Sequence, residues 1–229
     1  YYFPVADDIV GGAILGQSTV ICTKGSTYLS TQADPINFTP IQLDGWQPCV
    51  SKRSICKLQG GVMYASPDGL VSVDQSNGIR VITAQLITRD EWQAYKPESM
   101  MCVTHDGRLF VFYDTGTKKG GLIFEFASEG VTLIETTVHA TAAYADERRD
   151  ALFLVVEAGK LHKWDAGAAS LPHSWTSKVF IADRPQNIGA AQVVADGYPV
   201  TLQLTGKYNT SSDAQDVTQT IQVQNSRPF

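Results

Sequence analysis

The densest group of charged side chains in the chain is Asp146-Glu147-Arg148-Arg149-Asp150. Its three carboxylates are the residue type that binds Ca²⁺, but a calcium loop needs them at alternating, closely controlled positions together with glycine. Two arginines stand between them instead. The spacing therefore favours a solvated turn between two strands over a cation site. A catalytic carboxylate pair assembled from distant strands stays open, because spacing along the sequence does not test it.

Histidine and cysteine show no spacing typical of a metal, redox or nucleophilic centre. The histidines form neither HxH nor HExxH, the cysteines form no CxxC pair, and the chain lacks a GxSxG elbow and a P-loop. A free cysteine in an apolar strand behaves as a small buried hydrophobe. We therefore expect reduced thiols, surface or edge histidines, no catalytic residues, no metal, no cofactor and no enzymatic activity. The residues concerned are Cys22, Cys49, Cys56, Cys102, His105, His139, His162 and His173.

Two short motifs have both a functional and a structural interpretation. Ser66-Pro67-Asp68-Gly69 is similar to the Asp-box of sialidase-type propellers, but Leu70-Val71-Ser72 stands where that box has an aromatic residue. Asp-Gly between apolar residues is a strong hairpin signal, so a plain turn is favoured. Lys52 and Arg53, flanked by serines, are the candidate partner interface. Because short charge runs are weak evidence, a solvated turn or an internal salt bridge is the competing interpretation.

The elements that would hold these residues follow a hairpin pattern that recurs four times. Each copy has an apolar strand, a short polar turn ending in glycine, and a second apolar strand. The turn glycines are Gly25, Gly69, Gly107 and Gly159, with separations of 44, 38 and 52 residues. Repeats of roughly 40–50 residues built from short strands are typical of propeller blades. We predict an all-β fold with about four propeller-like blades, which need not close a ring within these residues.

The pattern divides the chain into two regions. Residues 1–170 would hold the blades, and residues 171–229 would hold β-sandwich-like strands; whether the second region is a separate domain stays open. The strand patterns of the second region lie at 175–181, 190–195, 200–204 and 217–223. In the first region, residues 109–113 are apolar at every position, as expected for a strand buried on both faces between stacked blades.

One stretch favours a helix. Thr88 is a plausible N-cap, and Glu91 stands three residues further on, which together make a capping box. Pro97 closes the pattern. A helix of about two turns is too short to be stable alone, so it must pack on the sheets, through Trp92 and Tyr95.

Composition agrees with a globular, β-rich protein. The chain has 229 residues, of which 43% are hydrophobic, and a net charge of −5. The negative balance argues against a phosphate-binding surface, which needs clustered lysine and arginine. No apolar run approaches the roughly 20 residues of a membrane-spanning helix. The chain begins without methionine and stops abruptly at Phe229, so we expect a piece of a longer protein.

Four stretches, in this order, carry a resemblance to a known family. They are Val50-Ser51-Lys52-Arg53-Ser54, Tyr64-Ala65-Ser66-Pro67-Asp68-Gly69-Leu70-Val71, Thr88-Arg89-Asp90-Glu91-Trp92 and Trp175-Thr176-Ser177-Lys178. Together they make residues 12–205 resemble structural proteins from the tails of bacteriophages and their prophages. The resemblance implies a tail nozzle or tail-tubular protein of a short-tailed phage, with a β-propeller and sandwich-like domains, that forms a ring around the DNA exit channel.

The resemblance also implies partners and a location. The partners would be copies of the chain itself in a ring, other tail and connector proteins, and DNA that passes without sequence-specific binding. The protein would lie in the virion tail after assembly in the host cytoplasm. The family is not enzymatic, so it implies no catalytic residues. Because only about four blades are visible here, a complete propeller would need strands from outside these residues.

Three functions remain, in descending order. The first is the structural tail protein. The second is a carbohydrate- or receptor-binding propeller at the tail tip, in which Trp46, Tyr95 and Tyr198 would stack on sugars. The third is a propeller glycoside hydrolase, which needs two carboxylates about 5–5.5 Å or about 6.5–9.5 Å apart. Fold analogy alone supports this third function, and fold is a weak guide to activity.

Overall fold

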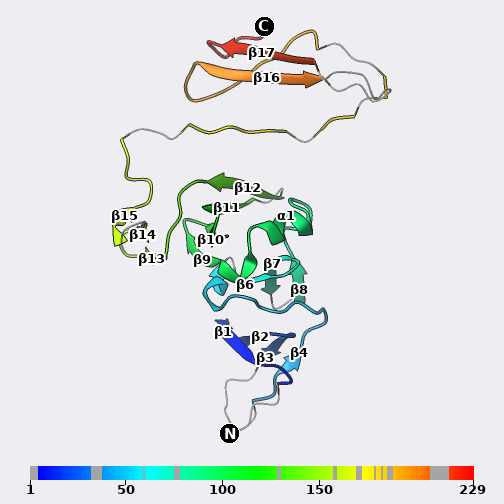
Figure 1. Ribbon diagram of the computed structural model, residues 1–229, viewed down its shortest axis with the longest axis vertical. Helices are drawn as coiled ribbons and strands as arrows, with labels where there is room; N and C mark the ends of the chain where they lie inside the picture. Colours follow the sequence, from blue (N-terminus) through cyan, green and yellow to red (C-terminus); the bar gives the residue numbers. More distant parts are fainter. Residues whose placement is uncertain are drawn as a thin grey trace. The chain divides into compact units, whose positions relative to one another are not determined.

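The predicted fold class, all-β, is confirmed by a computed structural model of the chain. It describes residues 5–31, 38–58, 60–74, 78–127, 130–156, 159–168, 172–177, 179–181, 183–184, 188–206 and 217–229. Strands make up 48% of the model and helices 7%, and the strands form antiparallel sheets (Figure 1). The chain divides into two compact units, Tyr1–Ser170 and Leu171–Phe229. Residues 32–37 of the expected connection and 207–216 of the polar tail lie outside the described residues.

Four sheets follow one another along the first unit. Sheet A contains β1 (Ile9–Leu15), β2 (Ser18–Thr23), β3 (Thr27–Ser30) and β4 (Ile41–Gln42). Sheet B contains β5 (Cys56–Leu58), β6 (Gly61–Ser66), β7 (Gly69–Asp74) and β8 (Gly78–Val81). Sheet C contains β9 (Met101–His105), β10 (Arg108–Asp114), β11 (Lys119–Ala127) and β12 (Gly130–Thr136). Sheet D contains β13 (Ala142–Asp146), β14 (Ala151–Val155) and β15 (Leu161–Lys163).

Each sheet is a meander in which every strand pairs antiparallel with the next strand of the chain. The four glycine-ended hairpins of the sequence are β2–β3, β6–β7, β9–β10 and β14–β15, so these predicted hairpins are confirmed. Chain reversals are thus local, and the polar turns carry the change of direction.

The sheets stack through their apolar faces, and sheet B shows how. Alternate side chains of β6 point to opposite faces of the sheet, as the period of a strand requires. Val62 and Tyr64 belong to the core cluster that sheet B shares with sheet A. Met63 and Ala65 belong to the cluster that it shares with sheet C.

Strand β10 has the same double role one sheet further along. Leu109, Val111 and Tyr113 lie in the cluster between sheets B and C. Phe110 and Phe112 lie on the other face, in the cluster between sheets C and D. All five side chains are almost fully buried, which confirms the predicted strand with two apolar faces. The core is therefore three apolar layers between four sheets.

The first strands of the four sheets lie next to one another: β1 contacts β5, β5 contacts β9, and β9 contacts β13. We call these four strands the inner-strand row. Each of them pairs along one edge only, because it begins its meander. The described residues do not close into a barrel or propeller.

The one α-helix of the described residues, α1 (Arg89–Ala94), begins with the predicted capping box. The Thr88 hydroxyl accepts the Glu91 backbone N–H, and the Glu91 carboxylate accepts the Thr88 N–H at 2.8 Å. Trp92 packs in the cluster between sheets B and C, and Tyr95 packs against the same cluster. The chain then turns through η2 (Pro97–Ser99) into sheet C.

The capping box makes the N-terminus of α1 sensitive to acid. The N–H and hydroxyl of Thr88 hold the pKa of Glu91 below its ordinary value of 4.5. A lowered pKa stabilises the fold above pH 4.5 and the gain is lost as the pH falls through the folded value. We therefore expect Glu91→Ala to destabilise the protein at neutral pH, and the difference from the unmodified chain to vanish in acid. Urea unfolding followed between about pH 6 and about pH 3 measures this. Asp90→Ala is the matched control, because Asp90 is in the same turn but outside the capping box; an equal pH dependence for both variants would contradict the expectation.

The second unit holds one two-stranded sheet among its described residues, β16 (Val200–Gly206) and β17 (Val217–Val223). The strands expected at 175–181 and 190–195 are wrong: their described residues are irregular. Trp175, Phe180 and Ile181 are largely exposed, so these apolar segments have no sheet to join. Apolar content predicts a strand only where a partner completes its hydrogen bonds. Among the described residues, no helix has the length and apolar character needed to cross a membrane.

Candidate functional site

The carboxylates singled out by the sequence are occupied in local structure. Asp146 accepts the backbone N–H groups of Arg148 and Arg149 at 3.1 and 3.3 Å, so it caps its own turn. Asp68 accepts Arg89 Nε at 2.7 Å and Gln47 Nε2 at 3.2 Å. No cluster of three His, Cys, Asp or Glu side chains that could hold a metal occurs in the described part of the chain.

The Ser66-Pro67-Asp68-Gly69 turn fastens α1 to sheet B. Besides the Asp68–Arg89 ion pair, the Trp92 indole N–H donates to the Ser66 carbonyl at 2.8 Å. The Ser66 hydroxyl donates to Gln47 Oε1 at 2.6 Å, which anchors the linker between sheets A and B. These contacts give the motif a structural role in the hairpin.

Lys52 and Arg53, the predicted interface residues, lie on η1 (Lys52–Ser54), at the entry to sheet B. The two side chains diverge in role. Arg53 Nη2 donates to the carbonyl of Thr141, just before β13, and lies 2.7 Å from Met101 Sδ in β9. Lys52 is exposed and lines a hollow between β1 and β5. Arg53 therefore ties η1 to sheets C and D within the chain.

The serines beside them point inward. Ser51 Oγ donates to the Met100 carbonyl at 2.7 Å, and Ser54 Oγ donates to the Ser51 carbonyl at 2.7 Å. Ser54 Oγ also accepts the Ala65 N–H at 2.8 Å. The segment from Ser51 to Ser54 is thus a fastening between sheets B and C, and it holds Lys52 at the surface.

The hollow between β1 and β5 has a volume of about 420 Å³. Lys52 and Lys57 are the charged side chains in its lining. A Cβ at Gly11 would lie 2.8 Å from Ile55 Cδ1, so glycine there lets η1 and β5 approach β1 closely. The residues that line it are Gly11, Gly12, Ala13, Ile14, Lys52, Ile55, Cys56 and Lys57.

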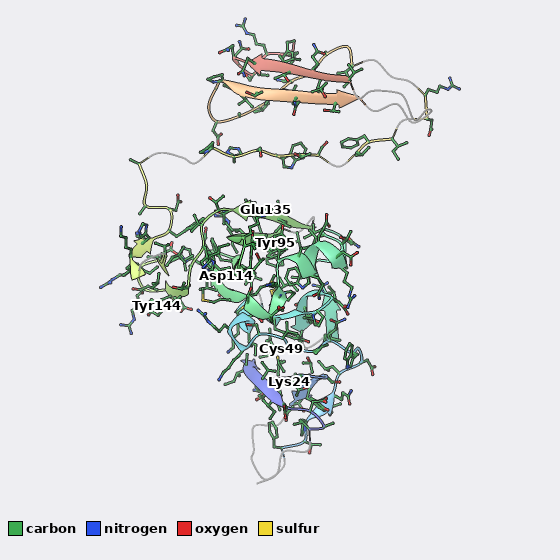
Figure 2. The ribbon with its side chains drawn as sticks, viewed as in Figure 1. Lys24, Cys49, Tyr95, Asp114, Glu135 and Tyr144 are labelled. Carbon is green, nitrogen blue, oxygen red and sulfur yellow. The ribbon has the colours of Figure 1, made fainter. Side chains whose placement is uncertain are left out.

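Sheet D has an apolar face that no described element covers. One face, through Leu152 and Leu154, packs on sheet C. The strand register places Tyr144, Phe153 and Lys163 in one row of the other face, and Ala142, Val155 and Leu161 in the next. Tyr144 is 65% exposed and Leu161 67% (Figure 2 labels Tyr144). The sequence signal for this open face is the absence of a fifth hairpin copy after β15.

Comparison with known proteins assigns no family. The chain matches no protein-family model, and no curated protein matches it. Its functional interpretation therefore depends on the geometry above and on the motifs of the sequence.

The aromatics proposed as sugar platforms differ in environment. Trp46 is 69% exposed. Tyr95 donates to Glu135 Oε1 at 2.8 Å, a pair labelled in Figure 2, and burial together with this hydrogen bond raises the pKa of Tyr95. Tyr198 donates to the Val193 carbonyl at 2.7 Å. Of the three, Trp46 offers the free ring face that stacking needs.

The contacts of Arg53 predict a measurable role in stability. We expect Arg53→Ala to lower the free energy of unfolding by about 1 kcal/mol, because the Thr141 carbonyl loses its donor at a solvent-exposed site. Urea unfolding checks this, with Lys52→Ala as the matched control on the same turn. The control should stay within about 0.5 kcal/mol of the unmodified chain; a larger loss for Lys52→Ala than for Arg53→Ala would contradict the assignment.

Proposed function

We propose that this protein is a structural component of a bacteriophage tail, of the nozzle or tail-tubular type. The inner-strand row carries the proposal. Four meanders stacked face to face, with their first strands side by side, match the way propeller blades are arranged around an axis. In this proposal sheets A to D are four blades, and strands from outside these residues complete the propeller.

The contacts of the conspicuous side chains support a scaffold. Asp68, Arg53, Ser51 and Ser54 all join one sheet, linker or helix to another. Residues with such roles fix the relative positions of the sheets. The rigid stack that results suits a protein whose task is to hold a defined shape in an assembly.

The charge of the chain supports a conduit for DNA. Its net charge is −5, and like charges repel, so a wall of this balance would not retain passing phosphates. In the proposed assembly, copies of the chain form a ring around the exit channel and contact other tail and connector proteins. The protein would assemble in the host cytoplasm and reside in the virion tail.

Two measurements test this proposal. Light scattering on the full-length protein, alone and mixed with tail partners, should report a ring of several subunits. Mass spectrometry of purified phage particles should find the protein in the virion. A protein that stays monomeric in both mixtures, and that is missing from particles, would overturn the proposal.

A second candidate function rests on the exposed Trp46. A binding propeller at the tail tip would use this indole to stack on a sugar or receptor, since aromatic rings offer apolar faces with polar edges. A glycan array probed with the protein and with Trp46→Ala distinguishes the two functions. Signals that disappear in the variant would favour receptor binding, whereas an array without signals favours the scaffold.

A further inference from the structure

The four cysteines, which are far apart in sequence, come together as two pairs. Cys22 of β2 and Cys49 of the linker before η1 are both in the core cluster between sheets A and B. Cys56 of β5 and Cys102 of β9 both pack against the cluster between sheets B and C. Their strands are neighbours in the inner-strand row. All four are free thiols.

Within each pair the thiols are in direct contact. The Cys22 thiol is hydrogen-bonded to Cys49, and the Cys102 thiol is hydrogen-bonded to Cys56. Sulfur atoms at hydrogen-bond separation need only a small adjustment to reach bonding geometry, because disulfides join Cβ atoms about 3.5–4.5 Å apart.

The two pairs differ in access to solvent. Cys22 and Cys49 are sealed in the core, with exposed fractions of 0% and 1%. Cys56 lines the hollow between β1 and β5, together with Lys52 and Lys57. These two ammonium groups would attract an anionic reagent to the hollow. Cys102 lies behind Cys56, where its hydrogen bond to Cys56 and then burial raise its pKa, so it is the poorer first nucleophile.

We propose that Cys56 and Cys102 are a thiol–disulfide exchange site for anionic low-molecular-weight disulfides of the glutathione type. Cys56 takes up the small molecule as a mixed disulfide, and Cys102 resolves it. The product is an internal disulfide that joins β5 to β9 and so links sheet B covalently to sheet C. This site is independent of the proposed structural function.

The two steps balance. The Cys56 thiol gives up its proton, and its sulfur attacks one sulfur of the small disulfide; that S–S bond breaks and one small thiol leaves. The Cys102 thiol then gives up its proton, its sulfur attacks the Cys56 sulfur, and the second small thiol leaves. In total the two protein thiols lose two electrons and two protons, and one small disulfide becomes two thiols.

The test uses the purified native chain and oxidised glutathione. After incubation, free thiols are alkylated and the disulfides are mapped by mass spectrometry of proteolytic peptides. We expect a Cys56–Cys102 crosslink, with Cys22 and Cys49 still alkylated as free thiols after unfolding. Cys102→Ser should accumulate glutathione on Cys56, whereas Cys56→Ser should leave Cys102 unmodified.

Two further variants sharpen the test. Lys52→Gln combined with Lys57→Gln should slow the first step several-fold with glutathione disulfide but not with a neutral reagent such as hydroxyethyl disulfide. Cys22→Ala is the matched control and should leave the crosslink unchanged. Circular dichroism verifies that each variant is folded.

Three results would overturn the proposal. They are a Cys22–Cys49 crosslink formed before the Cys56–Cys102 one, glutathione on Cys102 while Cys56 stays free, and native thiols that remain unmodified throughout. Because mapping of the unmodified chain already separates these results from the expected one, a variant that fails to fold does not remove the test.

Discussion

Replacing Trp92 with alanine is expected to lower the free energy of unfolding by about 3–5 kcal/mol, the usual cost of deleting a large buried aromatic side chain. Trp92 is 0% exposed and lies in the core cluster between sheets B and C. Its indole N–H also donates to the Ser66 carbonyl, which would lose a buried partner. The six-residue helix α1 depends on this side chain, since so short a helix is not stable alone.

Urea unfolding of Trp92→Ala measures the loss, and Trp46→Ala is the matched control. Trp46 is the same residue type but is 69% exposed, so its truncation should change stability by no more than about 0.5 kcal/mol. We also expect Trp92→Ala to expose α1 to proteolysis before the sheets unfold. Equal losses for the two tryptophans would contradict the structural role given to α1.

The second large effect is expected at a hairpin glycine. In Gly69→Ala the new Cβ would lie 2.3 Å from Thr83 Oγ1 and 2.5 Å from Val81 Cγ1, at a φ of +153°. Both the backbone conformation and the overlap are unfavourable, so we expect a loss of about 3 kcal/mol. The Thr83 hydroxyl accepts the Leu70 N–H, and its displacement would loosen the start of β7 as well.

Gly107→Ala is the control for this prediction, because Gly107 follows an aspartate in the corresponding hairpin of sheet C. Its φ is +69°, and nothing lies within 4 Å of the Cβ position. Only the backbone term applies, so the expected loss is about 1 kcal/mol. Thermal unfolding of both variants measures the difference; a Gly107→Ala loss as large as that of Gly69→Ala would show that overlap contributes little.

The same two turns show how far sequence reasoning reached. The Asp-Gly signal correctly predicted both hairpins. In sheet C, Asp106 and Gly107 both have positive φ, the reason that makes Asp-Gly a hairpin signal. In sheet B, Ser66 pairs with Gly69, so Pro67 and Asp68 form the turn and Asp68 is not among the residues with positive φ. Local chemistry predicts that the chain reverses, whereas the register with the partner strand decides which residues turn.

Contacts between sheets could not be predicted from the sequence. The pattern placed Lys52 and Arg53 in a short turn, but it held no information on the Thr141 carbonyl that Arg53 reaches. The pairing of Cys56 with Cys102 was missed for the same reason, because it follows from the packing of sheet B against sheet C. The strand β12 was also missed, since its polar alternation is typical of the exposed edge of a sheet.

The meander topology has a consequence for the way the chain acquires its structure. No strand pairs with a strand outside its own sheet's run of sequence, so the ladder contacts join residues that are near in the chain. Closing such short loops costs little entropy, and proteins rich in local contacts fold fast. We expect each meander to form soon after it leaves the ribosome and to present its apolar face to the meander synthesised next. The order of synthesis would then become the order of the stack, with misregistered pairing between distant strands disfavoured from the outset.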